Sequence, residues 1–134
     1  MRGPRAHVVL LVVLALAGCG QDERRMEADR VLRRVDALIA ADRAEKETPL
    51  AQLEAESCTD KKVCTAKQAC ADAFRPLVVS QRMQAEVRAA MQSGKDAAEM
   101  RKKLDDAEAA QKEAAAKMES CLQATDSARR AYRL

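Results

Sequence analysis

The strongest constraint on the fold is a repeat of small and apolar residues in the last third of the chain. Its members alternate at spacings of three and four over about five heptads; they are Ala97, Met100, Leu104, Ala107, Gln111, Ala114, Met118, Cys121, Thr125, Ala128 and Tyr132. This spacing places one stripe along a single helix face, which is typical of coiled-coil packing. We therefore expect a long helix from about Asp96 to Arg133 that packs against another helix.

A second stripe with the same spacing precedes the first. Its members are Ala66, Cys70, Ala73, Leu77, Ser80, Gln84, Val87 and Met91. It predicts a helix from about Lys61 to Gln92, with Thr59 or Asp60 as the residue that caps its N-terminus. Pro76 should bend this helix or interrupt it at Arg75, because proline lacks an N–H and crowds the preceding turn.

The segment Ser93-Gly94-Lys95-Asp96 separates the two stripes and is the strongest turn signal in the body of the chain, since Gly94 suits a helix C-terminus. No run of Val, Ile or Thr alternates as a strand would, and strong helix formers dominate the composition. The sequence therefore predicts an all-α fold, an antiparallel helical hairpin or three-helix coiled-coil-like bundle stapled by disulfides.

Two further helices are expected before the hairpin. The first runs from about Asp22 to Lys46, and its apolar stripe is Val31, Leu32, Val35, Leu38 and Ile39. A shorter helix runs from Pro49 to Ser57, with Thr48 as its N-cap and Pro49 in the first helical position. This short helix should bury Leu50 and Leu53.

The N-terminal segment has the pattern of a cleaved export signal. Arg2 and Arg5 precede an apolar run from Val8 to Ala17, which is too short to span a bilayer. The run ends in Leu16-Ala17-Gly18-Cys19, which resembles the lipobox of bacterial lipoproteins. This resemblance implies cleavage before Cys19, a diacylglyceryl group on its sulfur and acylation of the new amine. We therefore expect a signal peptide over 1–18, a lipidated tether over 19–25 and a helical domain over 26–134.

The same resemblance implies where the chain resides. Two or three acyl chains hold a protein on a membrane far more firmly than one chain does. Gly20 follows Cys19, in place of the Asp that retains many enterobacterial lipoproteins in the inner membrane. We therefore expect lipid anchoring at the periplasmic face of the outer membrane rather than of the inner membrane.

Charge and composition argue against nucleic acid as a partner. Removal of residues 1–18 takes away Arg2 and Arg5 and no acidic residue, so the formal charge falls from +3 to +1. A nearly neutral chain has no general attraction for nucleic acid or for anionic lipid. The only aromatic residues are Phe74 and Tyr132, which is poor material for stacking bases or sugars.

Lipidation of Cys19 leaves Cys58, Cys64, Cys70 and Cys121, an even set in an oxidising compartment. Six residues along one helix span about 9 Å, which argues against a Cys64–Cys70 bond. Folding the hairpin about its turn places Cys70 and Cys121 at nearly equal heights, both in their stripes. We therefore favour Cys70–Cys121 with Cys58–Cys64; the alternative is Cys64–Cys121 with Cys58–Cys70.

No motif indicates catalysis, a metal or a cofactor. The only histidine, His7, lies in the predicted signal peptide, so a Ser-His-Asp site or a mixed Cys/His zinc site is excluded after cleavage. The cysteines show no Cys-x-x-Cys spacing, and Asp105-Asp106 is most simply a solvated helix surface. We expect no catalytic residues, no metal ligands and no small-molecule substrate.

These features favour a lipid-anchored helical protein with a structural or protein-interaction role in the cell envelope, bound to a partner protein there. The alternative is a non-covalent tether to peptidoglycan. The chain is similar in style to the Braun-type lipoprotein, whose terminal Tyr-Arg-Lys is joined to the cell wall through its lysine. Here the last residues are Tyr132-Arg133-Leu134, so a covalent link is not supported. An enzyme or a metal-binding protein is less favoured still.

Overall fold

The computed structural model describes the backbone of residues 5–94 and 96–134 and, from Gly20 onward, their side chains. It contains four α-helices, α1 (Arg5–Ala40), α2 (Glu47–Ala55), α3 (Lys61–Gln92) and α4 (Ala97–Tyr132), and a 3-10 turn η1 (Arg43–Glu45) between α1 and α2. The described residues form no strand. The predicted all-α fold is therefore confirmed.

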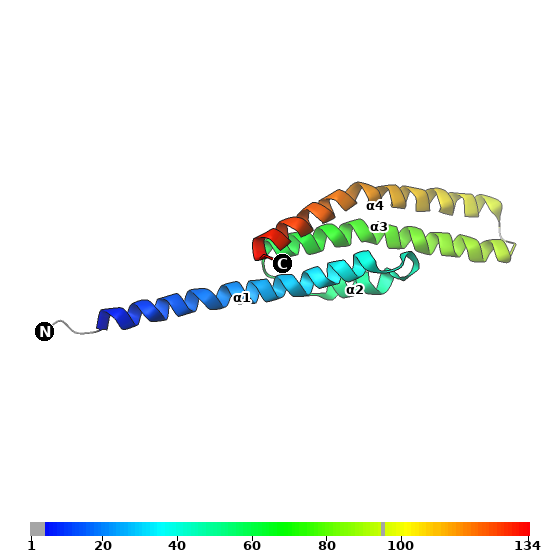
Figure 1. The fold of residues 1–134 in the computed structure, drawn as a ribbon. Coiled ribbons are helices and arrows are strands. Elements are labelled where there is room, and N and C mark those ends of the chain that lie inside the picture. Colours follow the sequence, from blue (N-terminus) through cyan, green and yellow to red (C-terminus); the bar gives the residue numbers. More distant parts are fainter. Residues whose placement is uncertain (1–4, 95) are drawn as a thin grey trace.

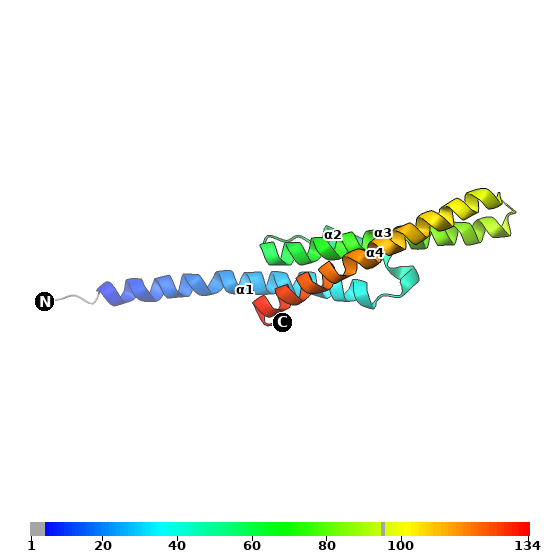
Figure 2. The ribbon, with the colours of Figure 1, turned by 90° about the horizontal axis from the view of Figure 1, so that it is seen from above.

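The molecule is elongated, with different elements at its two ends (Figures 1 and 2). α3 and α4 form an antiparallel hairpin, and α2 and the second half of α1 pack along the half of the hairpin that lies away from its turn. The first half of α1 projects beyond this bundle at one end, and the hairpin turn lies at the opposite end. No helix within the described ranges is both long and apolar enough to cross a membrane.

The core lies where all four helices meet. Its fully buried large side chains come from α1, α2 and α3, and include Val31, Val35, Leu38, Leu53 and Val63. α4 contributes mainly small residues, the buried members of its stripe being Ala107, Ala114, Cys121, Thr125 and Ala128. Small side chains allow the backbones of α3 and α4 to approach closely, but they bury little apolar area per residue.

Local signals set both ends of the α3–α4 hairpin turn and the start of α3. The Asp60 carboxylate accepts hydrogen bonds from the N–H groups of Lys62 and Val63, at 3.0 and 3.2 Å. The Asp96 carboxylate caps α4 in the same way. Gly94 has a φ of +69°, a conformation that favours glycine at a helix C-terminus. The predicted turn and the predicted α3 range are therefore correct, and Asp60, one of the two candidates, is the cap.

Three predicted details of the helices are wrong. α1 runs from Arg5 to Ala40 rather than from about Asp22 to Lys46, so residues 19–25 lie within it. α2 begins at Glu47, so Thr48 is not its cap; Pro49 is instead the third helical residue, where an N–H would have no partner within the helix. α3 continues through Pro76, so the second of the two predicted effects, an interruption at Arg75, does not occur. Phe74 and Val78, on either side of Pro76, pack in the core and hold this part of the helix.

Lys46 explains where α1 stops. Its side chain is buried, and its ammonium group donates to the carbonyl oxygens of Leu38, Ile39 and Ala41 at 2.8, 3.1 and 2.8 Å. The same group lies 5.3 Å from the centre of the Phe74 ring. Burial lowers the pKa of Lys46, whereas the unpaired carbonyls at a helix C-terminus favour a positive charge. Lys46 thus satisfies the end of α1 and joins it to α3.

We predict that Lys46→Met lowers the free energy of unfolding by about 2 kcal/mol, because three carbonyl groups lose a charged donor while the methylene chain stays in place. Urea unfolding followed by circular dichroism measures the loss. Lys102→Met is the matched control, since Lys102 is exposed on α4, and it should change stability by less than about 0.5 kcal/mol. Equal stability of the two variants would contradict the role of Lys46.

Candidate functional site

The structure joins the cysteines in the two pairs favoured above. Cys70 and Cys121 are fully buried between α3 and α4, with their sulfurs 2.03 Å apart and their Cα atoms 4.4 Å apart. Cys58 and Cys64 join the loop before α3 to the first turn of that helix, at a Cα distance of 5.5 Å. The alternative pairing is not found. Cys19 lies within α1, and its side chain is outside the described part of the chain.

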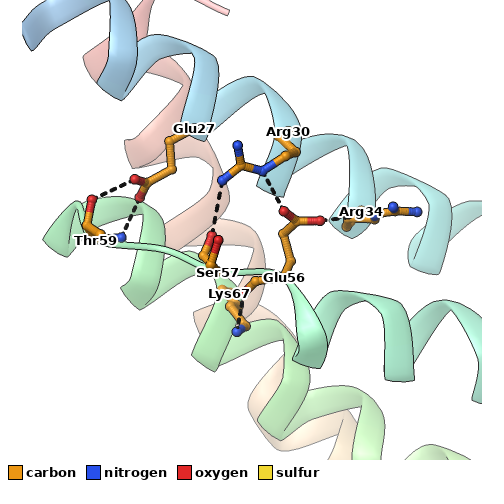
Figure 3. A network of polar contacts seen from close by, with 7 residues as sticks. All are labelled: Glu27, Arg30, Arg34, Glu56, Ser57, Thr59 and Lys67. Carbon is orange, nitrogen blue, oxygen red and sulfur yellow. Dashed lines mark hydrogen bonds and ion pairs between the residues drawn. The ribbon is translucent and has the colours of Figure 1, made fainter.

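A network of polar contacts fastens the α2–α3 loop to α1 (Figure 3). The Glu56 carboxylate, whose side chain is 14% exposed, lies between two guanidinium groups, Arg30 at 2.5 Å and Arg34 at 3.4 Å. Arg30 also donates to the Ser57 carbonyl, and Lys67 donates to the Glu56 carbonyl. A mostly buried carboxylate held from two sides positions the loop more firmly than an exposed ion pair would.

Glu27 of α1 holds the other end of this loop. Its carboxylate accepts hydrogen bonds from the Thr59 N–H and hydroxyl, both at 2.7 Å (Figure 3). It also accepts one from the Asp60 N–H at 2.9 Å. Partial burial raises the pKa of Glu27, but these three donors outweigh it and set the pKa below its ordinary value. A hydrogen bond from the Tyr132 hydroxyl lowers the pKa of Asp60. Helices α1, α3 and α4 therefore meet at one polar cluster.

The opposite end of the molecule presents apolar side chains instead. The hairpin continues past α2 (Figures 1 and 2), and there members of both stripes, on α3 and on α4, are exposed to solvent. Met91 is 67% exposed and Leu104 is 47% exposed. Together with Val87 and Met100 they line a shallow hollow of about 410 Å³, bordered by Ala97, Arg101 and Asp105. We call these seven residues the tip surface.

The tip surface is suited to binding and not to an evident reaction. Exposed methionines adapt to irregular apolar partners, because the side chain is flexible and polarisable. Among the side chains that the structure describes, no three His, Cys, Asp or Glu residues are grouped to hold a metal ion. The predicted stripes include Met91, Met100 and Leu104, but nothing in their spacing indicates that α1 and α2 stop short of them.

We predict unequal losses of stability when the two disulfides are removed. Closing a loop of 51 residues between Cys70 and Cys121 should contribute about 4 kcal/mol, and the shorter Cys58–Cys64 loop about 2 kcal/mol. The paired variants Cys70→Ala/Cys121→Ala and Cys58→Ala/Cys64→Ala test this by urea unfolding.

Dithiothreitol should reduce the half-buried Cys58–Cys64 bond before the buried Cys70–Cys121 bond. Simultaneous reduction of both bonds would contradict this order.

We predict that Glu27→Gln weakens the fold at neutral pH by about 1 to 3 kcal/mol, through loss of charged hydrogen bonds. Because its folded pKa is lowered, Glu27 stabilises the fold above its ordinary pKa, and this stabilisation is lost as the pH falls through the folded value. Unfolding between about pH 7 and pH 3 should therefore depend less on pH in Glu27→Gln. Glu23→Gln, one turn earlier and exposed, is the control and should behave as the unmodified chain.

No protein family model, curated protein or solved structure matches this chain. We therefore infer function from the arrangement of this chain's own side chains.

Proposed function

We propose that the chain is a lipid-anchored periplasmic protein that carries a protein-binding surface away from the outer membrane. The observation that supports this most directly is the separation of two features along the molecule. Cys19, the expected mature N-terminus, precedes the part of α1 that packs in the bundle away from the hairpin turn, and the tip surface lies beside that turn at the other end (Figure 1). An acylated Cys19 would hold the first end at the membrane and leave the second end accessible.

The length of the helices and the bonds between them support a role as a rigid spacer; we call the elongated helical bundle the rod. α4 has 36 residues and is about 54 Å long at 1.5 Å per residue. The buried Cys70–Cys121 bond links it to α3, and Arg129 forms an ion pair with Asp36 of α1. These cross-links oppose sliding of the helices, so a force or a contact at the tip is transmitted to the anchored end.

The tip surface supports a protein as the partner. Its centre consists of Val87, Met91, Met100 and Leu104, and its edge carries one positive and one negative side chain, Arg101 and Asp105. Neither of these two charged groups forms an ion pair within the described residues. An apolar centre with a charged rim is the usual composition of a protein–protein contact. The partner would present an apolar strip flanked by charges of both signs.

The cell-wall alternative finds less support in this arrangement. Binding of glycan strands commonly uses aromatic side chains that stack on sugar rings. Phe74 is buried in the core, and Tyr132 is half-buried at the end of the molecule opposite the tip surface. Neither ring is available for stacking at the tip, where the wall would be reached.

Photo-crosslinking in intact cells tests the proposal. A photoreactive amino acid at Met91 or Leu104 should give a discrete cross-linked product, because both side chains are exposed on the tip surface. Ala109 and Ser120, exposed elsewhere on α4, are the matched control positions and should give none. Mass spectrometry of the product identifies the partner. Equal labelling at all four positions would contradict a specific site.

The same cells provide the test of anchoring. The chain should fractionate with the outer membrane, and Cys19→Ser should release it or leave it unprocessed, because the thiol is the acceptor of the lipid. Co-sedimentation of the purified chain with peptidoglycan, without any product from Met91 or Leu104, would favour the wall tether instead.

A further inference from the structure

The arginines of this chain fall into two groups. Among the described side chains, most arginines are ion-paired, namely Arg30, Arg33, Arg34, Arg75, Arg82, Arg129 and Arg130. The arginines that form no ion pair within the described residues are Arg24, Arg25, Arg43, Arg88, Arg101 and Arg133. The first two and the last of these line one hollow, although Arg133 is more than a hundred residues away from the others in sequence.

This hollow, which we call the arginine cleft, lies between α1 and the last turn of α4. It has a volume of about 440 Å³ and is lined by Gln21, Asp22, Arg24, Arg25, Ala131, Tyr132 and Arg133. Asp22 is its one carboxylate. The nearby Asp60 accepts hydrogen bonds from Tyr132 and from two backbone N–H groups and lies within electrostatic reach of Arg24, so three guanidinium groups there face two carboxylates. The cleft therefore carries an excess of positive charge that the formal charge of the whole chain does not reveal.

The end of α4 places the Arg133 side chain at the cleft. Arg133 has a φ of 54° and a ψ of 49°, in the left-handed region, and it is the one non-glycine residue with positive φ in the described part of the chain. The N–H groups of Arg133 and Leu134 both donate to the Arg129 carbonyl oxygen, a common way for a helix to end. With the backbone fixed in this way, the Arg133 side chain lines the cleft.

The cleft also lies close to the expected lipid. Arg24 and Arg25 follow Cys19 within α1 by at most six residues, which is about 9 Å along a helix. An acylated Cys19 would therefore bring both guanidinium groups to the level of the phospholipid headgroups. Guanidinium groups bind phosphate through paired hydrogen bonds as well as charge.

We propose that the arginine cleft binds the phosphate headgroup of an anionic phospholipid in the membrane that holds the chain. This inference rests on the proposed anchoring. A headgroup bound between α1 and the end of α4 fixes the rod at two points, the acyl chains and the cleft. It thereby sets the direction in which the hairpin points, which a single flexible attachment could not do.

Vesicle binding by the purified, unacylated chain tests the proposal. The chain comprises residues 19–134 with Cys19→Ser; every buried core residue that the structure describes is at Ala28 or later, so the core is retained. Vesicles of phosphatidylcholine with and without phosphatidylglycerol are sedimented with the chain at low salt. The phosphatidylglycerol vesicles should bind it at least about tenfold more tightly, since each basic residue near an anionic surface adds to the attraction.

Two triple variants with the same change in charge separate the cleft from general attraction. Arg24→Gln/Arg25→Gln/Arg133→Gln should lower binding about tenfold or more. Arg43→Gln/Arg88→Gln/Lys102→Gln, which removes three exposed positive charges outside the cleft, should change it by less than about twofold. Circular dichroism verifies that both variants are folded. Equal losses, or no preference for phosphatidylglycerol, would overturn the proposal.

Inorganic phosphate distinguishes the two sources of the ligand. Millimolar sodium phosphate should displace the chain from the vesicles more than sodium chloride of equal ionic strength, because both ligands present a phosphate group to the same arginines. Binding of phosphate in the cleft without any preference for phosphatidylglycerol vesicles would identify a free anion as the ligand and overturn the assignment to lipid. If the vesicles do not bind the purified chain, the headgroup proposal is wrong, but the fractionation of Cys19→Ser in cells still tests the anchoring. If Cys19→Ser does not change the fractionation in cells, the anchoring proposal is wrong, but the vesicle result still stands. The two proposals therefore fail separately.

Discussion

The close approach of α3 and α4 is the contact on which the rest of the structure depends. It is built from alanines and other small residues, so the two backbones lie near enough for Cys70 and Cys121 to bond directly across the seam. Small side chains contribute little hydrophobic free energy for each residue buried. The Cys70–Cys121 disulfide adds stability that this small apolar area does not provide, because it restricts the unfolded chain across a long loop.

The remaining helices are held to this hairpin by the apolar core and by directed polar contacts around it. Lys46 binds the carbonyl end of α1 against Phe74, Glu27 binds the loop before α3, and Glu56 is fixed between Arg30 and Arg34. Each contact involves a charged group that is at least partly removed from water, where hydrogen bonds to charge are strongest. With few aromatic residues available, the chain uses such contacts to specify which helix lies where.

Charged and apolar side chains gather at different ends of the rod, and this separation bears on function. Polar groups and unpaired arginines gather where α1 meets the end of α4, and exposed methionine and leucine gather beside the hairpin turn. A nearly neutral overall charge conceals both features. The two ends are suited to different neighbours, an anionic membrane surface at one and a protein at the other, which is the division of labour that we propose.

The sequence by itself determined the helical class, the α3–α4 hairpin and the more favourable cysteine pairing. These follow from short-range rules, since residue spacing defines a helix face and Gly94 with Asp96 defines the turn. The lipid on Cys19 is likewise inferred from a sequence motif alone, and it stays a prediction. Spacing along one helix, however, carries no information about which other helix covers it.

Only the tertiary structure decided the features that join distant residues. Lys46 ends α1 through carbonyl groups of α1 and the ring of Phe74, and Pro76 is accommodated by the packing around it. Arg133 lines the same hollow as Arg24, although the two lie 109 positions apart in sequence. The exposure of Met91 and Leu104 arises because α2 stops short of the hairpin turn (Figure 1). Such outcomes depend on where helices lie relative to each other, which is set by the sum of many weak contacts rather than by any local pattern.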